Sequence, residues 1–136
     1  MATVTPGEIR AVADASAVLA WVFDETGADV VEQVLSVSGI SAVNFAEVLY
    51  IGSTRHYEPD DLEADLTAYG LSLLPFGGVE ARRIVDVRAA EQVAGLTLSL
   101  ADRCCLATAI THDVPVVASD AEWEALDLPI EVQPFR

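Results

Sequence analysis

The chain has 136 residues, of which 52% are hydrophobic, so it is long enough for one domain and apolar enough for a sizeable core. It carries 22 acidic residues against seven basic residues, all of them arginine, which gives a formal net charge of −15. This surplus of negative charge argues against non-specific binding of nucleic acid by the bare protein, because phosphate binding draws on positive charge. It is compatible with bound cations, with a basic protein partner, or with an acidic and well-solvated surface.

The compartment and the redox chemistry follow from what the sequence lacks. Its first ten residues have no basic segment followed by an apolar stretch, and no apolar run approaches the ~20 residues that span a bilayer. We therefore expect a cytoplasmic protein that makes no membrane contact. The adjacent residues Cys104 and Cys105 have a spacing that suits neither a disulfide framework nor a zinc site, and we expect both to pack inside a helix.

The first half of the chain alternates short apolar runs with segments of helical periodicity. In chain order it predicts a buried strand at 9–14, helices at 16–23 and 28–35, a short strand at 38–42, and helices at 43–57 and 59–70. The last of these helices has Pro59 and acidic residues in its first turn and Gly70 at its end, which are the usual start and stop signals of a helix.

The second half continues the alternation. It predicts a strand at 71–76, helices at 79–93 and 99–112, a strand at 114–119, a short helix at 120–126 and a weak strand at 130–134. This order of elements predicts an α/β fold in which a mainly parallel central sheet of about four to five strands is flanked by helices. In such sheets, ligand sites form outside the carboxyl ends of the strands.

Two aspartates stand where a site of this kind would form. Asp14 follows the apolar residues 9–13, and Asp120 follows the apolar residues 114–118. Both could therefore project into one crevice at the edge of the sheet. Each also precedes a predicted helix, where Asp is a favoured N-cap, and capping is the simpler interpretation of either residue taken alone.

Glu47 and Asp102 lie on largely apolar faces of their predicted helices. Tyr50 shares a face with Glu47, and Leu106 shares one with Asp102. A carboxylate on such a face is unfavourable unless it is paired or binds a metal ion. Glu47 could instead lie where its face opens to solvent, and Asp102 could form a capping box with Ser99, three residues earlier. A capping acid can also be a ligand, because the first turn lies at the mouth of the helix.

Carboxylates gathered at one edge of a sheet repel one another unless cations neutralise them. The four candidates are Asp14, Glu47, Asp102 and Asp120. Oxygen ligands without a useful His or Cys indicate Mg²⁺, or Mn²⁺, rather than zinc. Mg²⁺ bound in this way keeps several waters and recruits phosphates, which indicates metal-assisted hydrolysis of a phosphodiester bond.

Four stretches of the chain match, in order, the motifs of one known family. They are "VADASAVLAWVF" (12–23), "NFAEVLY" (44–50), "LSLADRCCLATA" (98–109) and "PVVASDAEW" (115–123). Together they resemble PIN-domain ribonucleases and, among these, the VapC-type toxins of toxin–antitoxin pairs. The resemblance covers nearly the whole chain and implies a single PIN-like nuclease domain over residues 1–136, which cleaves RNA by Mg²⁺- or Mn²⁺-dependent hydrolysis.

The resemblance also implies roles for individual residues. The catalytic and metal-binding residues would be Asp14, Glu47, Asp102 and Asp120. Ser16 would support them by orienting a water of the metal. Many relatives carry Thr or Ser two residues before the last Asp, where this chain has Ala118, and we expect Ser119 to substitute with a differently directed side chain. Arg103, beside Asp102, is our first candidate for RNA contact, although an ordinary surface position is an equally good interpretation.

Three partners follow from the resemblance. They are an RNA substrate, a second copy in a homodimer, and an antitoxin whose N-terminal part binds DNA and whose C-terminal tail wraps the toxin. Two alternatives to the nuclease stay open. One is a catalytically inactive PIN-like module that binds RNA or protein, and the other is a receiver-type signalling domain. The second is disfavoured because receiver domains need a late lysine and this chain has none.

Overall fold

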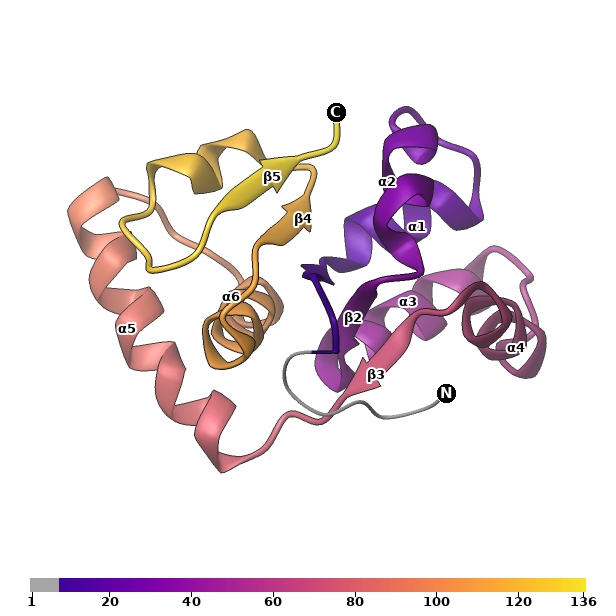
Figure 1. The fold of residues 1–136 in the computed structure, drawn as a ribbon, viewed down its shortest axis with the longest axis horizontal. Helices are drawn as coiled ribbons and strands as arrows, with labels where there is room; N and C mark the ends of the chain where they lie inside the picture. Colours follow the sequence, from indigo (N-terminus) through magenta and orange to yellow (C-terminus); the bar gives the residue numbers. More distant parts are fainter. Residues whose placement is uncertain (1–7) are drawn as a thin grey trace.

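The structure, a computed structural model, describes residues 8–136 and contains one five-stranded sheet within them. The strands are β1 Ala11–Ala13, β2 Ser38–Ser41, β3 Ser72–Leu74, β4 Val116–Ala118 and β5 Val132–Pro134. They pair in the order β3-β2-β1-β4-β5, and every neighbouring pair is parallel. Figure 1 shows β4 and β5 together on one side of the molecule and β2 and β3 together on the other. The predicted α/β fold with a mainly parallel sheet is confirmed.

Helices occupy most of the chain between these strands. They are α1 Ala15–Val22, α2 Ala28–Leu35, α3 Ala42–Thr54, α4 Pro59–Tyr69, α5 Gly78–Ala94 and α6 Leu100–His112, with a 3₁₀ helix, η1, at Ala121–Ala125. The prediction was wrong at the end of α3, which was expected to reach residue 57. His56 has a left-handed φ of 66°, and the Tyr57 amide donates to the Gly52 carbonyl oxygen over 2.9 Å, which closes the helix early.

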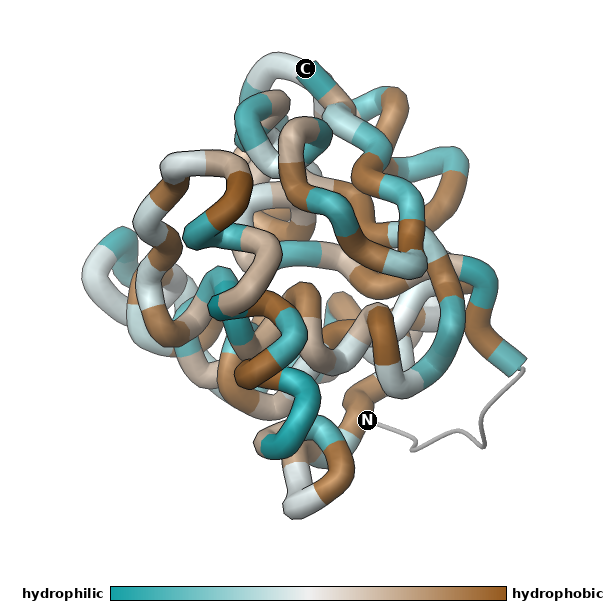
Figure 2. Tube along the Cα trace, turned by 90° about the vertical axis from the view of Figure 1, so that its left-hand side faces the viewer, coloured by the Kyte–Doolittle hydropathy of each residue, from teal (hydrophilic) through white to brown (hydrophobic). Residues whose placement is uncertain are grey.

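The two faces of the sheet pack into separate cores. Ala11 and Ala13 of β1 point into a core shared with α1 to α4, while Val12 points into a core shared with α5 and α6. Because both faces of the sheet are covered, the central strands β1 and β4 appear in the sequence as continuous apolar runs, Ala-Val-Ala and Val-Val-Ala. Hydrophobic and hydrophilic segments alternate along the helices in Figure 2, as expected where one side of each helix is turned inward.

Strand β2 has the unusual sequence Ser-Gly-Ile-Ser, and close packing explains its glycine. A Cβ at Gly39 would lie 2.6 Å from Leu74 Cδ1 of the neighbouring strand, so a larger residue would displace Leu74 from the core. At the end of β2, Ser41 caps α3 by accepting a hydrogen bond from the Val43 amide at 3.2 Å. The start of α3, which carries Glu47, is thereby fixed at the end of the strand.

Helix α6 begins with the predicted capping box. Ser99 Oγ accepts from the Asp102 amide at 3.1 Å, and Asp102 Oδ2 accepts from the Ser99 amide at 3.4 Å. Cys104 and Cys105 follow in the same helix as buried free thiols, as expected. Within residues 8–136, no helix combines the length and the apolarity needed to cross a membrane.

Candidate active site

Four carboxylates from four parts of the chain line one pocket at the carboxyl edge of the sheet. Its volume is about 310 Å³, and its lining includes Asp14, Glu47, Asp102 and Asp120. Asp14 follows β1, Glu47 lies in α3, Asp102 lies in the first turn of α6, and Asp120 follows β4. The pocket also contacts Ser16 and Ser119. The structure therefore brings together the predicted carboxylates and both predicted serines.

Asp14 occupies the N-cap position of α1, but its side chain caps nothing among the described residues. Its backbone amide donates to the Val117 carbonyl oxygen at 2.9 Å, which fixes Asp14 between β1 and β4. Its carboxylate accepts a hydrogen bond from Ser16 Oγ at 2.7 Å. The capping interpretation of Asp14 is wrong, because the local turn directs the carboxylate into the pocket.

Asp14 is disfavoured as a charged group. It is 8% exposed. Burial is the main cause that raises the pKa of Asp14, to about 6. The charges of Asp102 and Glu47 add to this rise, and the hydrogen bond from Ser16 partly opposes it. Asp14 is thus close enough to Glu47 and Asp102 to be repelled by both, whereas Asp120 is exposed.

Glu47 is half-buried and is held by Asn44, a residue that we did not predict as part of the site. Asn44 Nδ2 donates to Glu47 Oε1 at 2.9 Å and to the Ala101 carbonyl oxygen at 3.1 Å. Since Ala101 directly precedes Asp102, one buried amide group connects the helices that carry two of the carboxylates. Asn44 Oδ1 is buried without a hydrogen-bond partner among the described residues. The available signal was an Asn three residues before an acid on one helix.

Asp102 and Asp120 serve as helix caps and also line the pocket. Asp102 completes the capping box of α6, and Asp120 Oδ1 accepts from the Glu122 amide at 2.9 Å and caps η1. The capping interpretation of both residues is confirmed. A carboxylate has two oxygens with several lone pairs, so capping leaves each residue able to accept from or bind a further group.

Ser16, which lines the pocket, connects the residues that follow β1 and β4. Besides donating to Asp14, its Oγ accepts from the Ser119 amide at 3.3 Å. The contact that Ser119 makes here is therefore through its backbone. Ala118, which has no hydroxyl, is fully buried at the end of β4.

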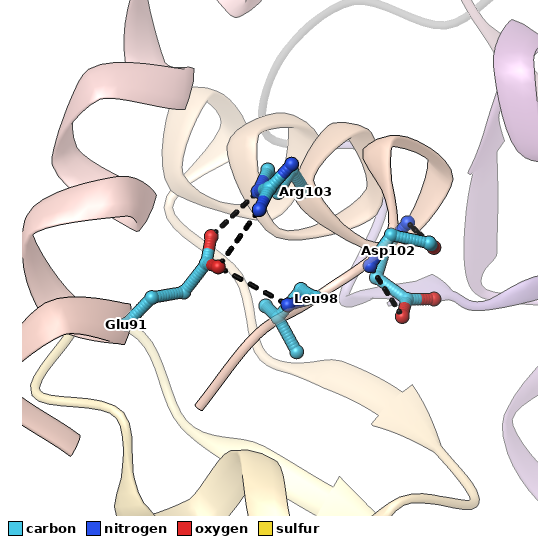
Figure 3. Close-up of polar contacts among 5 residues, drawn as sticks. Glu91, Leu98, Asp102 and Arg103 are labelled. Carbon is cyan, nitrogen blue, oxygen red and sulfur yellow. Dashed lines mark hydrogen bonds and ion pairs between the residues drawn. The ribbon is translucent and has the colours of Figure 1, made fainter. Parts of the chain in front are cut away.

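Arg103 is directed toward α5. Its Nε donates to Glu91 Oε1 at 2.7 Å and its Nη2 donates to Glu91 Oε2 at 3.0 Å (Figure 3). Arg103 is not one of the described residues that line the pocket. The guanidinium is thus engaged by α5 in this structure, and RNA contact by Arg103 stays a prediction.

The donor set of the pocket fits a hard cation such as Mg²⁺. Carboxylate oxygens are its preferred protein ligands, and a cation would relieve the repulsion that contributes to the raised pKa of Asp14. Within residues 8–136, no three Asp, Glu, His or Cys side chains are grouped closely enough to hold one ion together. Mg²⁺ is usually bound through one or two carboxylates and keeps several waters, so a site with fewer than three grouped ligating side chains is compatible with it.

Comparison with solved structures shows a widely shared fold. VapBC2 from Rickettsia felis, bound to a DNA fragment from its promoter, has a TM-score of 0.71 at 14% identity, covering 93% of this chain and 98% of that chain. DNA-bound VapBC from Salmonella typhimurium has a TM-score of 0.71 at 16% identity, and the match covers 94% of this chain and 99% of that chain. FitAcB from Neisseria gonorrhoeae has a TM-score of 0.68 at 20% identity, covering 92% and 97%. No curated protein matches the sequence.

The sheet order and the family match decide between the remaining fold families. Receiver domains have the strand order 2-1-3-4-5, whereas this sheet has the order 3-2-1-4-5. The profile of the PIN domain matches residues 11–128, a range that contains all four carboxylates of the pocket. The chain belongs to the PIN domain family.

Proposed function

We propose that the chain is a metal-dependent endoribonuclease that hydrolyses phosphodiester bonds in RNA. The observation that carries this proposal is the convergence of four carboxylates from four elements on one pocket. Membership of the PIN domain family supports nuclease chemistry at that pocket. The oxygen-only donor set supports Mg²⁺ or Mn²⁺ as the cofactor.

In this proposal the chain's own residues position the cation and the substrate. Asp14 and one of its neighbours, Glu47 or Asp102, would hold the ion, and waters would complete its coordination. Ser16 fixes one oxygen of Asp14, and Asn44 fixes one oxygen of Glu47. When bound, the ion would lower the pKa of the attacking water and stabilise negative charge on the phosphate. Asp120 lies at the exposed rim, where it would be the carboxylate nearest to incoming RNA.

The same proposal makes the chain the toxin of a toxin–antitoxin pair in the cytoplasm. The solved structures that share its fold include VapBC and FitAcB complexes, two of which are described as bound to DNA. By analogy, the chain would form a homodimer and bind an antitoxin whose N-terminal part binds DNA. The net charge of −15 favours a basic antitoxin segment.

The nuclease is tested by incubating the purified protein with total RNA in Mg²⁺, with and without EDTA. We expect cleavage that EDTA abolishes and that Asp102→Asn reduces by at least about a hundredfold, because this substitution removes a charged ligand from the pocket. Asp61→Asn is the matched control. It changes an exposed acid at the equivalent third position of α4, and it should cleave like the wild type. Cleavage that survives EDTA, or an Asp102→Asn protein as active as the wild type, would contradict the mechanism.

A catalytically inactive RNA- or protein-binding module is the second candidate. Two observations favour it: Ala118 stands where many relatives have a hydroxyl, and no three ligating side chains within residues 8–136 are grouped tightly enough to share one ion. RNA that is retained by the wild type in Mg²⁺ or Mn²⁺, yet stays intact, would establish this alternative.

A further inference from the structure

Glu91 is a buried carboxylate on α5, a helix whose outer side is exposed. Its exposed fraction is 5%, and a buried charge is unfavourable unless it is paired and hydrogen-bonded. Glu91 accepts three hydrogen bonds from two residues. Its Oε1 accepts from Arg103 Nε at 2.7 Å, and its Oε2 accepts from Arg103 Nη2 at 3.0 Å and from the Leu98 amide at 3.1 Å (Figure 3).

The partner of Glu91 is the residue next to a carboxylate of the pocket. Asp102 and Arg103 both lie in the first turn of α6, and their side chains leave this turn on different sides (Figure 3). The Arg103 side chain is 27% exposed, so no tight packing confines it on the solvent side. If the pair with Glu91 were broken, the long and flexible Arg103 side chain would be free to turn toward the acidic pocket, which is the neighbouring group of negative charges.

We propose that Glu91 is a positioning residue that keeps the Arg103 guanidinium out of the acidic pocket. This inference rests on the proposed function, since it takes the pocket as the cation site. A guanidinium in the pocket would compete with Mg²⁺ or Mn²⁺ for Asp102 and its neighbours. The bidentate pair with Glu91 prevents this competition, because a planar guanidinium held at two nitrogens has a fixed direction.

The hydrogen bond from the Leu98 amide offers a simpler role for Glu91. Leu98 directly precedes the N-cap Ser99, so Glu91 could act by fixing the backbone that leads into α6. The two roles predict different behaviour when Arg103 is also removed. If Arg103 is the competitor, its removal restores cation binding to a Glu91 variant. If the backbone is what matters, its removal restores nothing.

The test is Mn²⁺ affinity, measured by electron paramagnetic resonance or calorimetry without RNA. We expect Glu91→Gln to weaken Mn²⁺ binding by about five- to tenfold. The released Arg103 guanidinium would enter the pocket and compete with Mn²⁺, and solvent would partly screen its charge. The double variant Glu91→Gln with Arg103→Gln should return to within about twofold of the wild type. Asp86→Asn is the matched control, because it makes the same change of charge and frees Arg83 elsewhere on α5.

Two results would overturn the role of Glu91: unchanged Mn²⁺ affinity in Glu91→Gln, or equal weakening in the single and double variants. If circular dichroism shows that Glu91→Gln does not fold, Glu91→Asp replaces it, because the shorter acid keeps the charge but loosens Arg103. A wild type that fails to bind Mn²⁺ overturns this inference as well.

The RNA assay is read separately. A wild type that binds Mn²⁺ without cutting RNA contradicts the nuclease, while the Mn²⁺ comparison still decides for or against Glu91.

Discussion

Asp14 and Glu91 are buried to a similar extent, with exposed fractions of 8% and 5%, but their surroundings differ in charge. Asp14 faces other carboxylates, and burial together with these charges raises its pKa to about 6. Glu91 faces a guanidinium, and the hydrogen bonds from Arg103 hold its pKa below the ordinary value of 4.5 despite its burial. Burial is the main cause of the raised pKa of Asp14, whereas the hydrogen bonds from Arg103 are the main cause of the lowered pKa of Glu91.

The difference indicates which acid serves the fold and which serves the site. The folded structure favours the charged form of Glu91, so this residue stabilises the contact between α5 and α6. It disfavours the charged form of Asp14, so ionised Asp14 opposes folding. A buried acid whose charged form the folded structure disfavours is a candidate for function, because selection for stability alone would have replaced it.

The largest expected effect is an opposite change in stability when the two acids are removed. In EDTA at pH 7.5, Asp14→Asn should raise the free energy of unfolding by about 1–3 kcal/mol, because it removes a buried repelled charge. Glu91→Ala should lower it by about 2–3 kcal/mol, because the Leu98 amide and Arg103 lose their acceptor. Urea unfolding measures both, and RNA cleavage should be lost in Asp14→Asn. If both variants lose stability alike, the contrast between the two acids is wrong.

The fold was predictable where local residues specify an element. Pro59 and Gly70 bound α4 because proline suits the first turn and Gly70 adopts a φ of 103°, which glycine accepts readily. The end of α3 was missed because its closing residue is His56, which adopts a left-handed conformation without being glycine. The strands were predicted too long, since an apolar run extends past the three or four residues that pair with a neighbour.

The site was predictable only in part, for a related reason. Asp14, Asp102 and Asp120 follow from their positions at strand ends and in a helix cap, which are local features. Asn44 was missed because its second partner, Ala101, lies 57 residues away, and no spacing rule connects them. Arg103 stands beside Asp102 in sequence, but its direction is set by Glu91 on another helix. Side-chain direction of this kind depends on tertiary packing.

The pH dependence of stability sharpens the same comparison with a smaller effect. The folded pKa of Asp14, about 6, lies above its ordinary value of 3.8, so the stability contributed by Asp14 falls as pH rises through this window. The folded pKa of Glu91 lies below 4.5, so its contribution is complete above that pH and is lost as pH falls. In EDTA, the stability advantage of Asp14→Asn should therefore vanish as the pH is lowered from 7 to 4. An advantage that stays constant over this range would show that the charge of Asp14 is not its cause.

The smallest expected effects separate the two serines beside Asp14. Ser16→Ala removes the donor to Asp14 and the acceptor of the Ser119 amide, and we expect Mn²⁺ affinity to fall by about tenfold, as when second-sphere partners of metal ligands are removed. Ser119→Ala keeps the backbone amide that makes this contact, so its affinity should stay within about twofold of the wild type. Both variants should unfold within a few degrees of the wild type, which excludes a general loss of structure.

An equal loss of Mn²⁺ affinity in the two variants would mean that the Ser119 hydroxyl acts at the site, as expected if it replaced the hydroxyl that Ala118 lacks. The contrast between a serine that acts through its side chain and one that acts through its backbone would then be wrong.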